Sequence, residues 1–160
     1  MSSSQVPLES PKGYKPGRVG ASMMVEKITC WGHENVRATH RSTLEFTKED
    51  YLTPRGDCIL CIKADKGMDD LSEEFKRALR EGRRLRIVIR AGDIEDEVIA
   101  WGDERLILSH PLSMVVRKSE YVDGRTLALR ANKAAKDIRR DLVELLKRPD
   151  TQVEVELIVE

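Results

Sequence analysis

The sequence lacks both an excess of charge and a long apolar run. Lys and Arg together number 28, as do Asp and Glu, so the formal net charge is zero. A neutral chain has no overall attraction to nucleic acid or to acidic membranes. No apolar run approaches the roughly 18 residues of a membrane span, and residues 1–24 lack the apolar region of a secretion signal. We expect a cytoplasmic protein with no membrane partner.

Side-chain amides are also scarce, whereas charged residues make up 35% of the chain. The amides are Gln5, Asn35, Asn132 and Gln152. Heat-adapted proteins avoid thermolabile amides and are rich in charged residues that form ion-pair networks. This composition predicts a thermophilic source.

Cysteine is limited to Cys30, Cys58 and Cys61. An odd number of cysteines, in a chain long enough to form a core without cross-links, is typical of reduced thiols. We therefore predict three free thiols and no disulfide partner.

The chain divides into a tail and one domain. Residues 1–23 are rich in Ser, Pro and Gly and have almost no apolar periodicity, which predicts a flexible N-terminal tail. Residues 24–160 are expected to form a single β-rich domain. No repeat with a period of about 20 to 50 residues is visible.

The dominant pattern after residue 24 is the alternation of apolar and polar side chains, which is typical of strands. It predicts strands over 25–31, 36–47, 58–64, 85–91, 94–101, 105–108, 113–119, 126–130 and 153–159. Helical spacing of apolar residues predicts helices over 70–81 and 132–147. The expected fold class is mainly β (α+β): an antiparallel β-sandwich or barrel with two helices packed on it.

Three of these strands carry further expectations. The strand over 36–47 places His40 on its apolar side, and the run over 58–64 is expected at the centre of a sheet. The strand over 153–159 has a glutamate-rich face that discourages edge-to-edge pairing, so we expect a monomer or a weak dimer.

Polar residues in separate segments are the candidates for a site. If the segments converge, they form a pocket for a small polar or anionic ligand, which is the leading functional hypothesis. The candidate ligand-binding residues are His33, Asn35, His40, Thr43, Asp57, Arg125, Thr126 and Lys133. The alternative for His40 is a core histidine with a satisfied hydrogen bond.

Two other functions remain open at this point. In a hydrolase-like enzyme, His40, Asp57 and Cys58 would be the catalytic candidates, because a carboxylate can orient an imidazole that serves as a base. In an RNA-binding protein, the basic segments 76–90 and 117–148 would contact the phosphate backbone. The alternative is that these cations pair with acidic segments such as 93–104 on an ion-paired surface.

A zinc site is one alternative, because His33, His40, Cys58 and Cys61 have side chains that bind zinc. Cysteines three apart on a strand point to opposite faces, and Ile59 and Leu60 do not form a chelating turn. We therefore predict no metal and no cofactor.

Three ordered motifs carry a family resemblance. They are Gly32-His-x-Asn-x-x-x-x-His-x-x-Thr-Leu-Glu45, Leu52-Thr-x-x-Gly-Asp-Cys-Ile59 and Arg125-Thr-Leu-Ala-x-x-Ala-x-Lys-Ala-Ala135. Together they resemble a family of small archaeal proteins catalogued as a domain of unknown function, from about Met24 to Glu160. The resemblance implies an archaeal, cytoplasmic protein with a mainly-β, sandwich-like fold, and it implies no reaction.

Overall fold

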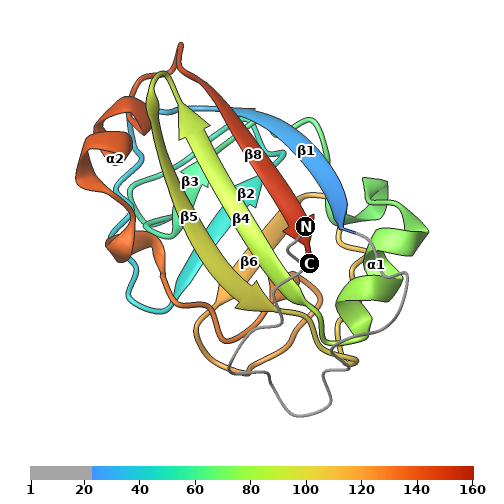
Figure 1. Ribbon diagram of the computed structural model, residues 1–160. Coiled ribbons are helices and arrows are strands. Elements are labelled where there is room, and N and C mark those ends of the chain that lie inside the picture. The colour runs from blue at the N-terminus through green and yellow to red at the C-terminus, as the bar shows by residue number, and fades with distance from the viewer. Residues whose placement is uncertain (1–22) are drawn as a thin grey trace.

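Two four-stranded sheets and two short helices form the domain in a computed structural model that describes residues 23–160. Figure 1 shows the larger sheet in front, with the smaller sheet behind it. The expected α+β sandwich with two helices is therefore confirmed, and the sheets do not close into a barrel. The predicted tail, apart from Met23, lies outside the described residues.

The larger sheet is antiparallel throughout. In spatial order it contains β1 (Met24–Trp31), β8 (Gln152–Val159), β4 (Arg84–Ala91) and β5 (Ile94–Trp101). Gly92 has a positive φ of 58° in the tight turn between β4 and β5, as the Gly-Asp turn signal predicts. The strand over 153–159 is an inner strand of this sheet, so its glutamates do not lie on a sheet edge.

The smaller sheet combines antiparallel and parallel pairs. Its order is β3 (Ile59–Cys61), β2 (Thr43–Thr47), β6 (Ser113–Arg117) and β7 (Thr126–Ala128). β2 and β6 are antiparallel, whereas β3 and β7 pair with them in parallel. β3 is thus a short edge strand, not the central strand that its apolar sequence predicted. Single bridges from Trp31 to Ile62 and from Trp101 to Leu129 join the two sheets.

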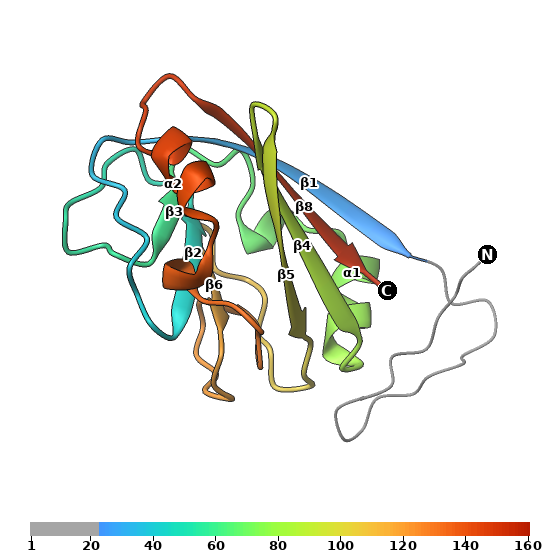
Figure 2. The same cartoon turned by 60° about the vertical axis from the view of Figure 1, so that its left-hand side comes forward.

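The two predicted helices are shorter than their apolar patterns. Each begins with a 3-10 turn, η1 (Met68–Asp70) or η2 (Ala135–Asp137), followed by α1 (Glu73–Arg80) or α2 (Arg140–Leu146). α1 contacts β1 and β8, whereas α2 contacts β3, β4 and β5. Figure 2 shows the helices apart from each other, on different sides of the sheets. Within residues 23–160, neither helix is long and apolar enough to cross a membrane.

The two halves of the domain, 24–91 and 94–159, repeat the same order of elements. β1, β2, β3, η1, α1 and β4 have the counterparts β5, β6, β7, η2, α2 and β8. If each strand is replaced by its counterpart and the strand order is then read in reverse, both sheets keep the same strand order. The agreement extends to the backbone, since Ala38 and Leu108 share a positive φ, as do Lys63 and Arg130. The domain therefore contains two copies of one structural repeat. Its period is longer than the roughly 20 to 50 residues over which the sequence showed no repeat.

Several predicted strands are shorter than expected, and one is absent. The pattern over 36–47 becomes a strand only from Thr43, because Ala38 has a φ of 52°, which interrupts an extended chain. The segment 105–108 forms no strand. Its last residue, Leu108, is the counterpart of Ala38 and has the same left-handed backbone. Val36, Ala38, Leu106 and Leu108 are nevertheless buried, but in irregular loops.

Cys30 on β1 and Cys61 on β3 form a disulfide, so the prediction of three reduced thiols is wrong for these two. Their Cα atoms lie 5.7 Å apart, although 31 residues separate them along the chain. The sequence pattern concealed this pair because Cys58, not Cys30, is the near neighbour of Cys61. Cys58 is the free thiol.

Candidate functional site

The smaller sheet has a polar face that is turned away from the core. Along β2, Leu44 and Phe46 belong to the hydrophobic core. The side chains between and beside them point to the opposite face, because successive residues of a strand alternate. These are Thr43, Glu45 and Thr47, and all three are buried.

Glu45 is the unusual member of this face, because its side chain is only 5% exposed. Its Oε1 accepts a hydrogen bond from the Cys58 thiol at 3.4 Å and lies 3.8 Å from Nη2 of Arg125. Within residues 23–160, Oε2 has no hydrogen bond. We define Thr43, Glu45, Cys58 and Arg125 as the outer-sheet site.

Two other carboxylates with low exposure show how this protein ordinarily satisfies a buried charge. Asp96 accepts from Nζ of Lys133 at 2.5 Å and from the amides of Glu97 and Arg139 at 2.7 and 2.9 Å. Burial opposes its ionisation, but these bonds outweigh burial and lower the pKa of Asp96. Glu26 is the counterpart of Asp96, and it accepts from Lys66 and from the amide of Ser72, each at 2.9 Å. By this comparison, Glu45 is under-satisfied.

The Cys58 thiol is held in its protonated form. Burial, reinforced by the negative charge of Glu45, raises the pKa of Cys58 to about 12. A hydrogen bond with the Thr43 hydroxyl opposes this shift only in part. Because the thiolate is the nucleophile, this arrangement gives no support to Cys58 as a nucleophile at neutral pH.

His40 lies beside the outer-sheet site, but its ring is engaged in a turn. Nδ1 accepts from the amides of Ser42 and Thr43 at 3.2 and 3.1 Å, and lies 3.1 Å from Oγ1 of Thr43. The His40 amide donates to the carbonyl of Asp57 at 3.2 Å, so these two predicted residues are adjacent through their backbones. Within the described residues no hydrogen bond joins the imidazole to the Asp57 carboxylate. His110 receives the amides of Leu112 and Ser113 in the same way, which points to a structural role for both rings.

The other predicted site residues make contacts elsewhere. His33 accepts from the Asn35 amide, and the Asn35 side chain donates to the carbonyl of Leu52. Thr126 is buried and bonds with Arg117 and Asp123. Lys133 pairs with Asp96, as described above. Of the candidate set, the structure thus brings together His40, Thr43, Asp57, Cys58 and Arg125.

Glu45 was missed by sequence reasoning, although a signal for it was present. An acid between Leu44 and Phe46 on a strand whose neighbours are buried is an unusual position for a charge. The repeat makes the position clearer, since β6 carries Val115 directly opposite Glu45. Val115 is buried but lies outside the main core cluster. The fold therefore accepts an apolar residue at this place.

Arg125 and Cys58 occupy equivalent positions, immediately before β7 and β3. The carbonyl of Arg125 accepts from the amide of Val115 at 2.8 Å, as the carbonyl of Cys58 accepts from the amide of Glu45 at 2.9 Å. The two halves have thus diverged to place an acid and a thiol on one side and a guanidinium on the other. The outer-sheet site lies where the halves meet, and its charged pair occurs once in the described domain.

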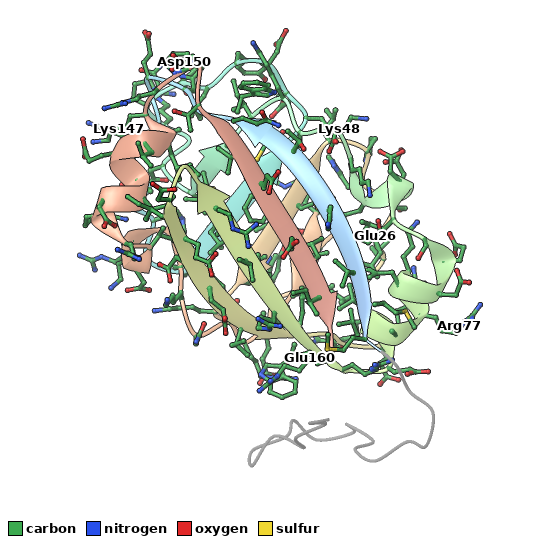
Figure 3. All side chains as sticks on the ribbon, turned by 45° about the horizontal axis from the view of Figure 1, so that its top comes forward. Glu26, Lys48, Arg77, Lys147, Asp150 and Glu160 are labelled. Carbon is green, nitrogen blue, oxygen red and sulfur yellow. A yellow bond between two sulfur atoms is a disulfide. The ribbon has the colours of Figure 1, made fainter. Side chains whose placement is uncertain are left out.

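The basic segments are extensively paired with acids. The pairs include Arg84 and Arg86 with Glu160, Arg90 with Glu95 and Glu154, Arg117 with Asp123, Lys118 with Asp137, and Lys133 with Asp96. Figure 3 shows Glu160 at the end of β8, whereas Arg77 projects away from α1. This pairing is that of an ion-paired surface, and RNA binding stays a prediction.

Among residues 23–160, no cluster of three His, Cys, Asp or Glu side chains could hold a metal ion. Cys61 is bonded to Cys30, so the Cys58-x-x-Cys61 spacing is not a pair of thiolate ligands.

A duplicated two-sheet α+β fold, with one under-satisfied carboxylate on the outer face of its smaller sheet, defines the class of this protein. Residues 28–160 match the family described as Domain of unknown function (DUF371), and the chain belongs to this family. An archaeal relative, the uncharacterized protein MJ0206 of Methanocaldococcus jannaschii, is 55% identical over 120 residues. The match covers 75% of this chain and 89% of the relative. The family resemblance seen in the motifs is confirmed.

Proposed function

We propose that this protein binds a small polar ligand at the outer-sheet site. The observation that carries the proposal is Glu45, a carboxylate whose side chain is 5% exposed, with one thiol hydrogen bond and a guanidinium nitrogen 3.8 Å away. Buried charges are costly unless they are paired and hydrogen-bonded. A ligand that supplies the missing donors would offset this cost.

The repeat supports a functional reason for this charge. At the equivalent place β6 has Val115, so the architecture itself does not require a carboxylate. Retaining an under-satisfied acid at a strand position that accepts valine is characteristic of a site, where stability is exchanged for function. The proposal narrows the predicted ligand-binding set to Thr43 and Arg125, and adds Glu45 and Cys58.

Thermal shift tests this proposal, because a ligand that binds only the native state raises the melting temperature. A panel of sugars, nucleotides, amino acids and small organic acids is screened against the wild type, Glu45→Val and Arg55→Gln. Arg55 is exposed on the loop before Cys58 and serves as the matched control. We expect at least one compound to stabilise the wild type and Arg55→Gln but not Glu45→Val. Equal shifts in all three proteins, or no shift with any compound, would overturn the proposal.

We also propose a cytoplasmic location in a thermophilic source. The scarcity of amides and the extensive ion pairs support heat adaptation. The Cys30–Cys61 disulfide is compatible with it, because intracellular proteins of hyperthermophilic archaea are rich in disulfides. The relative described above comes from a thermophilic archaeon.

A further inference from the structure

We infer that the ligand of the outer-sheet site is a small zwitterion of the α-amino acid class, an inference that rests on the proposed function. In such a molecule an ammonium group and a carboxylate are attached to the same carbon. The ammonium would donate to Glu45, and the carboxylate would accept from Arg125. Three features of the site lead to this class.

The first feature is what Glu45 lacks. Oε2 has no hydrogen bond within residues 23–160, and the nearest cationic nitrogen to Oε1 is 3.8 Å away, too far for a hydrogen bond. The thiol of Cys58 is a weak donor. A buried carboxylate in this condition favours a group with several N–H donors and a positive charge, which describes an ammonium.

The second feature is the free capacity of Arg125. Its side chain is 48% exposed, and within the described residues its only charged contact is Glu45. A guanidinium has five donors in a planar fork that matches the two oxygens of a carboxylate. Arg125 can therefore bind an external carboxylate while it stays beside Glu45.

The third feature is the short distance between the opposite charges. With 3.8 Å between Oε1 of Glu45 and Nη2 of Arg125, a simple anion at Arg125 is repelled by Glu45. A simple cation at Glu45 is likewise repelled by Arg125. A ligand whose own opposite charges are about 3 Å apart can hydrogen-bond to Glu45 and to Arg125 at once.

The divergence of the two halves fixes the number of sites. Val115 and Cys58 replace Glu45 and Arg125 at the equivalent positions, so the charged pair is not repeated on the other side. We therefore expect one ligand per chain.

Calorimetric titration with the twenty common amino acids tests the inference, with propionate and ethylamine as probes that carry one charge each. We expect one or more amino acids to bind wild type with a 1:1 stoichiometry, and propionate and ethylamine to bind at least tenfold more weakly. Glu45→Gln and Arg125→Gln are each expected to weaken that binding at least tenfold, whereas Arg55→Gln leaves it unchanged.

The outcomes separate this inference from the function on which it rests. If nucleotides, sugars or propionate bind wild type and depend on Glu45, but amino acids do not bind, the zwitterion is wrong and the binding function stands. If propionate binds as tightly as the amino acids and Glu45→Gln has no effect, the site recognises a carboxylate alone and the zwitterion is again wrong. If neither this series nor the wider panel binds, both proposals fail.

Discussion

Glu45 carries a charge where the equivalent strand carries Val115, and this exchange has a measurable effect on stability. Replacing Glu45 by Val removes a buried, under-satisfied carboxylate and copies a residue that the fold already accommodates. We expect Glu45→Val to raise the free energy of unfolding of the ligand-free protein by about 1–3 kcal/mol, measured by urea denaturation at neutral pH.

Asp96→Asn is the matched comparison, because this carboxylate has three hydrogen-bond donors. Its replacement is expected to lower stability by about 1–3 kcal/mol, since a charge-assisted network is broken. A loss of stability in Glu45→Val as large as that in Asp96→Asn would mean that Glu45 has a structural role.

Acid sensitivity is a second property of single residues. The amide of Ala134 and the Lys118 ammonium lower the pKa of Asp137 to about 2, and hydrogen bonds that outweigh burial lower the pKa of Asp96 and of Glu26. A carboxyl group whose pKa is lower in the folded state stabilises the protein above its unfolded pKa of about 4. We expect the melting temperature to fall as the pH is lowered from about 5 towards 2, and Asp96→Asn to reduce this dependence.

Single residues also decided which parts of the site could be predicted. Arg125, Thr43 and Cys58 could be identified as chemically capable groups, but their convergence on Glu45 depends on the pairing of β3 with β2, of β2 with β6 and of β6 with β7. His40 was assigned to an apolar face on the assumption of a regular strand. The left-handed backbone at Ala38 breaks that regularity, and alanine gives no warning of it.

At the scale of elements, two glycines allow each helix end to approach the opposite half. A Cβ at Gly102 would lie 1.9 Å from the carbonyl oxygen of Leu79 in α1, and a Cβ at Gly32 would lie 2.3 Å from the carbonyl oxygen of Arg148 beyond α2. Both contacts are with backbone atoms, which cannot rotate away. The approach therefore requires glycine at both positions.

Gly102→Ala is accordingly expected to lower the free energy of unfolding by about 1–3 kcal/mol or more, through overpacking against α1. Gly124→Ala is the control, since a Cβ there meets nothing within 4 Å. Urea denaturation of both variants decides the point: equal midpoints would show that α1 can shift without cost.

The elements themselves were predicted unequally well. The strands that form β1, β4, β5 and β8 were predicted nearly to the residue, because alternation with regular pairing partners is unambiguous. The helices were predicted too long, since Leu71, Ala135 and Ile138 lie outside the two α-helices but also belong to the hydrophobic core. Asn132, the first residue of the second predicted helix, accepts a hydrogen bond from the amide of Ile99 and lies before η2.

At the scale of the whole molecule, the repeat makes the two ends of the domain equivalent to an internal turn. Met24 pairs with Val159 across β1 and β8, as Ile94 pairs with Ala91 across β5 and β4. A Gly-Asp link that replaces Glu160 and joins Val159 to Met24 would copy the two-residue turn of Gly92 and Asp93. We expect a permuted chain opened at this turn to fold, with a circular dichroism spectrum and cooperative melting like those of residues 24–160.

Opening the permuted chain inside β4 instead, at Val88, is the contrasting design. β4 pairs with both β5 and β8, so a break there removes hydrogen bonds on two sides. If both permuted chains fold equally well, the equivalence of the two junctions has no energetic consequence. The repeat could not be found at periods of about 20 to 50 residues, because Trp31-Gly32 and Trp101-Gly102 lie 70 residues apart.

The disulfide makes the two flanks of the molecule unequal. Cys30 and Cys61 reinforce the flank where Trp31 bridges to Ile62, whereas Ala100 and Ala128 occupy the corresponding places beside the bridge from Trp101 to Leu129. The two sheets are therefore joined by a covalent bond on only one flank of the sandwich. We expect the amides of Trp101 and Leu129, on the flank without the disulfide, to exchange hydrogen faster than those of Trp31 and Ile62. Reduction of the disulfide is expected to make the exchange rates of the two pairs more similar.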